Sequence, residues 1–141
     1  MIIIRIWHQK LIPYLPRQQL LGQHRECCAL RGKGWGKKHS VVDYVFKDPP
    51  ECLVVYHYMI MEEMERRGYH PDRVWDDPSW RGSTLGKDDN FANAQLVYEL
   101  WMNFNQMNIM IYPEHNDEYL KECIDNLCGK GVDVSEMEKL L

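Results

Sequence analysis

The chain has 141 residues, of which 45% are hydrophobic, and a formal net charge of −4. This length favours a single globular domain that buries enough surface to fold without disulfides or bound metal. The five cysteines are odd in number, form no CxxC pair and follow no secretory leader, so we expect reduced thiols in the cytoplasm. Residues 1–4 are the longest N-terminal apolar run, far short of the ~18 residues of a membrane span. We expect no membrane association.

Charge divides the chain unevenly. Residues 1–47 carry nine basic and two acidic side chains, a balance of +7, whereas residues 48–141 carry eight basic and 19 acidic side chains, a balance of −11. A basic segment is typical of a surface that faces a phosphate backbone. The alternative is that the basic segment simply lies against the acidic remainder of the same chain.

Hydrophobic spacing predicts helices in most of the chain. After an extended start, Pro16 is placed to begin a first helix that Gly32 ends, and Ser40 with Asp43 indicates a short helical turn. A long central helix is predicted to begin in the segment DPPE, residues 48–51, with Asp48 as its cap, and to end at Gly68.

Loop and helix signals alternate in the second half. Residues 71–87 contain Pro and Gly at irregular intervals, and we expect a loop that its tryptophans tether to the body. Asp88 or Asp89 is the expected cap of a third long helix, and a shorter acidic helix is expected over residues 114–128, with a final turn after Val134. The predicted fold class is all-α, a compact bundle of three to four main helices with long connecting loops, forming one domain over residues 1–141.

Most candidate sites for chemistry are weak. His24, Cys27, Cys28 and His39 are possible zinc ligands, but only one close pair is present where standard zinc sites use two. We therefore expect packed thiols and no metal or other cofactor. The common nucleotide and hydrolase motifs are absent from the sequence. What remains is Glu26, which the helical spacing turns outward, amid basic residues. A carboxylate there would repel phosphate unless it serves acid/base chemistry or stabilises a cation; the alternative is a silent surface ion pair.

Four short motifs in order resemble one family. They are QQLLGQHRE at residues 18–26, KKH at residues 37–39, ERRGY at residues 65–69 and WRG at residues 80–82. Together they resemble the pyrimidine-dimer DNA glycosylases of the phage endonuclease V type over residues 4–82. The resemblance implies an all-α enzyme that acts on damaged duplex DNA, turns a nucleotide out of the stack, cleaves the glycosylic bond and cuts the abasic sugar.

The resemblance also implies roles for single residues. Glu26 matches the catalytic carboxylate, Arg25 a phosphate clamp beside the opened base pair, and Arg5 an arginine near the family's N-terminus. The family's nucleophile is an N-terminal α-amine, and its position matches Ile4, with three residues in front of it. Either the arm folds back to bring in the Met1 amine, or a lysine (Lys10, Lys37 or Lys38) reacts, or Glu26 activates water, or catalysis has been lost.

We predict a DNA glycosylase and abasic-site lyase that binds damaged double-stranded DNA as a monomer. The rival hypotheses are a non-catalytic nucleic-acid-binding module on the same fold, and a basic face for an acidic protein partner or a second copy of the chain. The expected nucleic-acid contacts are Arg17, Gln18, Gln19, Arg31, Lys33, Lys37, Lys38, His39 and Arg81.

Overall fold

The computed structural model describes residues 5–36 and 43–141. Over these residues the chain forms α-helices and short 3-10 helices and no β-strand, which confirms the all-α prediction. In chain order the elements are η1 (Gln9–Tyr14), α1 (Arg17–Arg31), α2 (Asp43–Lys47), α3 (Pro50–Arg66), η2 (Arg73–Asp76), α4 (Ala94–Met107), α5 (Asp117–Gly129) and α6 (Ser135–Glu138).

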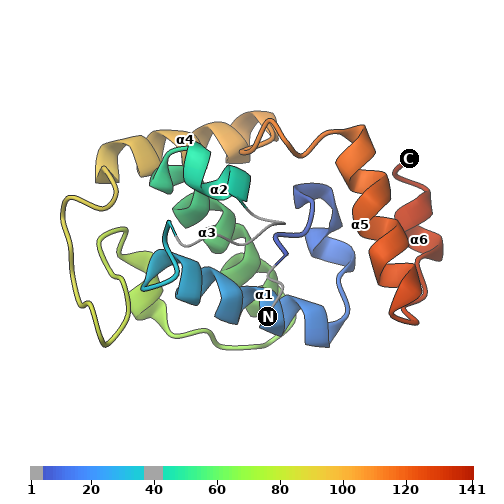
Figure 1. Ribbon diagram of the computed structural model, residues 1–141, viewed down its shortest axis with the longest axis horizontal. Helices are drawn as coiled ribbons and strands as arrows, with labels where there is room; N and C mark the ends of the chain where they lie inside the picture. Colours follow the sequence, from blue (N-terminus) through green and yellow to red (C-terminus); the bar gives the residue numbers. More distant parts are fainter. Residues whose placement is uncertain (1–4, 37–42) are drawn as a thin grey trace.

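Helix α3 is the central packing element. Twelve of its 17 residues are buried, because its own apolar side chains are distributed around the helix and are not confined to one face. Helices α1 and α4 lie along opposite sides of α3, and α2 and η1 complete its cover (Figure 1). One continuous hydrophobic cluster runs from Ile6 in the N-terminal arm to Met137 in α6.

The structure corrects the start of two predicted helices. Helix α4 begins at Ala94, where the Asn93 side chain accepts a hydrogen bond from the Leu96 backbone at 3.0 Å, so neither Asp88 nor Asp89 is its cap. Helix α3 follows Pro49 and has no side-chain cap, although Asp48 was the expected one. In both cases the residue directly before the helix, Pro49 or Asn93, has the non-helical backbone conformation of a cap position.

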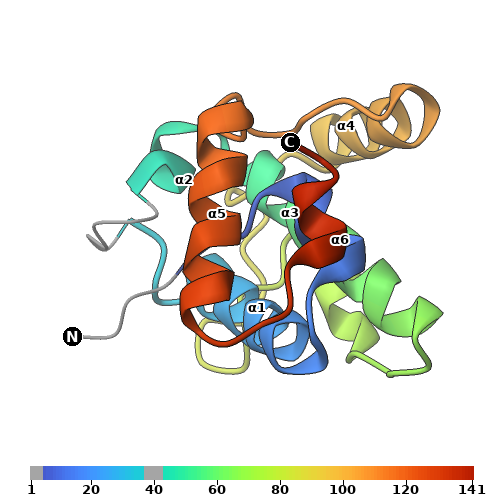
Figure 2. The same cartoon turned by 90° about the vertical axis from the view of Figure 1, so that its right-hand side faces the viewer.

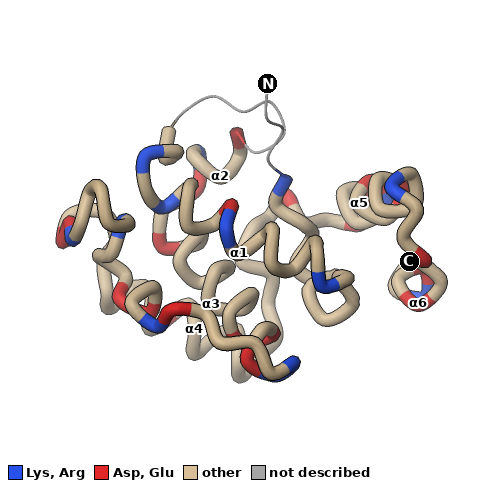
Figure 3. The backbone as a smooth tube through the Cα atoms, turned by 90° about the horizontal axis from the view of Figure 1, so that it is seen from below, with Lys and Arg blue, Asp and Glu red and all other residues tan. Residues whose placement is uncertain are grey.

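Residues 71–87 form the tethered loop that the sequence predicts. Within it, Trp75 and Trp80 pack edge to face with ring centroids 6.4 Å apart. The loop is held against the end of α1 by Arg31 and Arg81, described below. In the view from below, α5 and α6 lie together on one side of α1 (Figure 3).

The acidic C-terminal helices pack beside the N-terminal arm, residues 5–8. The Tyr119 hydroxyl of α5 donates to the Ile6 carbonyl at 2.6 Å, and α6 contacts η1. Figure 2 shows α5 and α6 side by side. The chain's first described residues are thus enclosed between α1 and α5. Among the described helices, none combines the length and apolar character required to cross a membrane.

Candidate active site and nucleic-acid interface

Gln23 of α1 holds the N-terminal arm in place. Its Oε1 accepts a hydrogen bond from the Trp7 backbone N–H at 2.7 Å, and its Nε2 donates to the Arg5 carbonyl at 2.8 Å. The Tyr56 hydroxyl of α3 lies 2.9 Å from the same Oε1 and donates to the Trp7 carbonyl at 2.6 Å. Gln23 is 1% exposed, so these bonds form in a dry environment where each lost partner is costly.

The same amide reaches Glu26, one turn further along α1. Gln23 Nε2 donates its second hydrogen to Glu26 Oε2 at 3.0 Å, and the Arg5 backbone also hydrogen-bonds to this carboxylate. The arm and the carboxylate therefore meet at Arg5. Glu26 is half-buried rather than turned fully outward, because the arm covers one side of it. It takes part in no ion pair with the described basic residues.

Burial sets the protonation of this carboxylate. It raises the pKa of Glu26 from an ordinary 4.5 to about 7. The hydrogen bonds from Arg5 and Gln23 and the charges of Arg25 and Lys130 act in the opposite direction but are weaker than desolvation. Near neutral pH both forms of Glu26 are therefore present in comparable amounts, which is the condition for a group that both takes and gives a proton.

Arg5 is the first residue of the arm, and its half-buried side chain extends toward α5. Its Nη1 lies 3.7 Å from Glu122 Oε1, and its guanidinium carbon lies 5.7 Å from the centre of the Trp7 ring. The pairing with an exposed carboxylate on α5 neutralises part of its charge. Arg5 therefore reaches Glu26 through its backbone, while its side chain points toward the acidic helix.

The exposed side of α1 carries two of the predicted nucleic-acid contacts, Arg17 and Gln18, and the predicted phosphate clamp, Arg25. Arg17, Gln18 and Arg25 are exposed and, with Leu21, line a shallow hollow. Arg17 also lies over the Tyr69 ring, 5.6 Å from its centre. Neither Arg17 nor Arg25 pairs with a described carboxylate, so both cations are available to an anionic partner.

Two predicted nucleic-acid contacts are turned toward the protein instead: Arg31 is buried and Arg81 is half-buried. Arg31 has no exposed surface, and it donates to the carbonyls of Trp75 and Asp77, both at 2.8 Å. Arg81 donates from Nε to the Arg31 carbonyl at 2.9 Å and stacks on Phe91 at 4.3 Å. The basic composition of the chain's first part does not distinguish an arginine that binds phosphate from one that binds backbone carbonyls. A guanidinium has several donors, and here they satisfy carbonyls that would otherwise be buried without partners. We do not retain these two arginines as DNA contacts.

The remaining predicted contacts are less informative. Lys33 is exposed in the turn after α1, and Gln19 is half-buried on α1. Lys37, Lys38 and His39 fall outside the described residues.

Three residues of the site were not predicted from the sequence: Gln23, Tyr56 and Lys130. Gln23 precedes Glu26 by three residues, which puts both on one helix face, so its role was in principle readable. Tyr56 and Lys130 come from α3 and from the end of α5, and only tertiary packing brings them here.

Comparison with known protein families finds a match in the N-terminal part of the chain. A family model described as pyrimidine dimer DNA glycosylase matches residues 4–77, more than half of the chain. The matched segment contains the arm, Gln23, Glu26 and Tyr56. No curated protein and no solved structure matches the chain.

Proposed function

The chain belongs to the pyrimidine dimer DNA glycosylase family, and on that premise we propose that it excises damaged bases from duplex DNA and cuts the resulting abasic site, with Glu26 as its catalytic carboxylate. The observation that carries the proposal is the state of Glu26. This carboxylate is half-buried, is held by Gln23 and the Arg5 backbone, has a pKa of about 7 and has no ion-pair partner among the described residues.

These properties match the chemistry at the sugar. As the glycosylic bond breaks, C1′ gains positive charge, which ionised Glu26 would stabilise electrostatically. The attacking amine loses a proton when it bonds to C1′, and Glu26 would take that proton and give it to the sugar ring oxygen as the ring opens to the imine. A pKa near neutrality allows both tasks, whereas an ordinary surface glutamate would remain ionised.

The amine that attacks C1′ is assigned to the neighbourhood of Arg5. One residue of extended chain spans ~3.5 Å, so an α-amine on residue 4 would lie about that far from the Arg5 nitrogen. The Met1 amine is three residues further from Arg5, and those residues span up to ~10 Å, so the segment before Arg5 would have to fold back to bring this amine to the site. Lys10 lines a different hollow, between η1, α3 and α4. Lys130 is an additional candidate, because its charge acts on the Glu26 carboxylate from the end of α5.

We assign DNA binding to the exposed side of α1. Arg17 and Arg25 are eight residues apart, which corresponds to ~12 Å along the helix. Two unpaired cations at that spacing suit contacts with phosphates on either side of an opened base pair. Arg25 lies next to Glu26 in sequence and lowers the Glu26 pKa, so the phosphate contact and the reacting sugar would be adjacent.

The test uses ultraviolet-irradiated duplex DNA and a duplex with a single abasic site. We expect the native protein to cut both and Glu26→Gln to lose at least about 100-fold in rate, as is typical for a general acid/base. Glu122→Gln is the matched control, since it removes an exposed carboxylate close to Arg5 and leaves Glu26 in place. Equal cutting by the native protein and Glu26→Gln would rule out the assigned carboxylate.

Borohydride trapping on abasic DNA identifies the nucleophile. A trapped adduct on the segment before Arg5 or on Lys130, located by mass spectrometry, supports covalent catalysis at this site. Binding that weakens log-linearly with salt, with no cutting and no adduct, would instead establish the non-catalytic module.

A further inference from the structure

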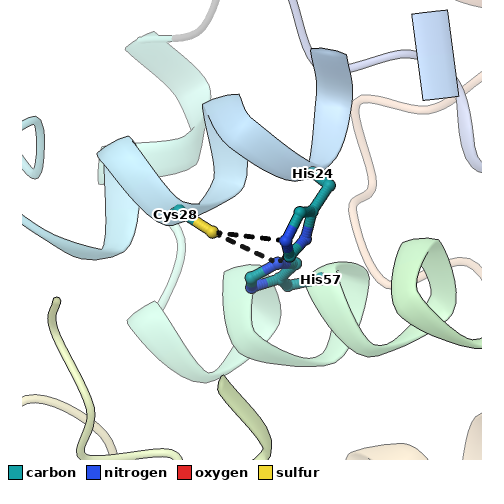
Figure 4. A group of neighbouring side chains, drawn as sticks. All are labelled: His24, Cys28 and His57. Carbon is teal, nitrogen blue, oxygen red and sulfur yellow. Dashed lines mark hydrogen bonds between the residues drawn. The ribbon is translucent and has the colours of Figure 1, made fainter. Parts of the chain in front are cut away.

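A second cluster of chemistry-bearing side chains lies between α1 and α3, away from Glu26. It consists of His24 and Cys28 of α1 and His57 of α3 (Figure 4). The two α1 residues are one turn apart and face α3, whereas Glu26, between them in sequence, lies about 200° around the helix. The three ligand atoms all lie within 4.8 Å of one another, and His24 and Cys28 are half-buried while His57 is buried.

The spacing of these atoms suits a small cation. Cys28 Sγ lies 3.8 Å from His24 Nε2 and 3.8 Å from His57 Nε2. In a tetrahedral zinc site with Zn–N of about 2.0–2.1 Å and Zn–S of about 2.3 Å, sulfur and nitrogen are about 3.6 Å apart. Cys28 Sγ and His57 Nε2 are therefore nearly at the separation of two ligands already, and His24 Nδ1 faces the same His57 nitrogen at 2.8 Å. All three sit on long helices whose mutual packing fixes their positions.

The protons of the cluster follow from one neighbour. Arg31 Nη1 lies 3.0 Å from His57 Nδ1, and because arginine only donates, this nitrogen accepts. The proton of neutral His57 is then on Nε2 and is donated to His24 Nδ1 at 2.8 Å. His24 in turn carries its proton on Nε2, facing Cys28. The cluster is a chain of neutral groups that begins at a buried cation.

A cation can replace those protons without adding charge beside Arg31. His24 binds through Nδ1 and keeps its proton on Nε2, while His57 Nε2 and Cys28 Sγ release theirs to solvent. Two protons leave and a dication enters, so a thiolate, a neutral imidazole and an imidazolate surround it and the net charge is unchanged. Arg31 continues to donate to His57 Nδ1. Burial raises the pKa of the Cys28 thiol to about 12, but a coordinated thiol loses its proton.

We propose that His24, Cys28 and His57 form a binding site for zinc or a similar divalent cation, braced by Arg31 and completed by solvent at a fourth position. Bound metal would tie α1 to α3 and stabilise the fold that supports Glu26. Sequence spacing alone paired His24 and Cys28 with Cys27 and His39, because His57 is 29 residues beyond Cys28.

The experiment titrates Co²⁺ into the untagged, chelator-treated chain and records absorption. We expect a thiolate-to-cobalt band and visible tetrahedral bands that saturate at one equivalent and disappear when Zn²⁺ is added. We also expect Zn²⁺ to raise the melting temperature. Cys28→Ser should abolish the thiolate band and weaken binding at least about tenfold, and His24→Gln should weaken binding to a similar degree while altering the visible bands.

The matched control is Cys128→Ser, because Cys128 is an exposed thiol at the end of α5. It should leave the spectrum and the melting-temperature gain unchanged. The proposal is overturned if one equivalent of Co²⁺ produces no thiolate band, if the band persists in Cys28→Ser, or if it is lost in Cys128→Ser. Should Cys28→Ser fail to fold, the His24→Gln titration decides, since unchanged affinity in that variant also overturns the site. Cutting of DNA is not a readout here, so the result is separate from the proposed glycosylase.

Discussion

Replacement of Gln23 by Met tests whether one buried amide organises the site. Methionine has similar volume and no hydrogen-bonding amide, so the packing is kept and the bonds are lost. The Trp7 N–H and the Arg5 carbonyl, bonded at 2.7 and 2.8 Å, lose this partner in the interior. At about 1–3 kcal/mol for each unsatisfied group, partly offset by the apolar side chain, we expect a loss of about 2–4 kcal/mol in unfolding free energy.

Urea denaturation followed by tryptophan fluorescence measures this loss, and the melting temperature should fall by roughly 6–15 °C. Gln18→Met is the matched control, because Gln18 is exposed on the same helix and should change stability by less than about 0.5 kcal/mol. Losing the Gln23 donor also disfavours ionised Glu26, so the Glu26 pKa should rise above 7 and the low-pH limb of any cutting activity should move to higher pH. If Gln23→Met is as stable as Gln18→Met, the network does not hold the arm as described.

Three further predictions concern stability, pH and DNA binding. Arg31→Gln should lower the unfolding free energy by at least about 2 kcal/mol, because three loop carbonyls lose their donor. Arg25→Gln should leave stability within about 0.5 kcal/mol but weaken DNA binding and reduce the salt slope by about one; equal destabilisation by both would contradict the interior placement of Arg31. Because the folded-state pKa of Glu26 is raised to about 7 from 4.5, its contribution to stability is present below pH 4.5 and is lost as pH rises through 7. Glu26→Gln should therefore gain roughly 1–3 kcal/mol relative to the native chain between pH 4.5 and pH 8, after allowing for solvent at the half-buried carboxylate, and denaturation curves at the two pH values check this.

The helices and the position of the proposed catalytic carboxylate were predictable because their signals are local. Apolar residues at i+3 and i+4 and the flanking Pro and Gly residues define α1 and α3 to within one or two residues, and Glu26 was identified from its motif and its basic neighbours. The errors were also local. Asn93 outcompeted the aspartates upstream as a cap, and the 3-10 turn η1 contains Pro13, which conceals helical spacing.

Tertiary packing decided which charges face solvent and which partners meet. Charge counts could not separate Arg25, which is exposed, from Arg31, which is buried under the loop of residues 71–87, because the distinction depends on a contact with carbonyls more than 40 residues away. The pKa of Glu26 likewise depends on its burial and on the Arg5 backbone and the Lys130 charge, which distant segments bring to it, and the His24–Cys28–His57 cluster depends on α3 packing against α1. Spacing within a helix is encoded by its own residues, whereas desolvation and ligand geometry arise only when distant segments come together.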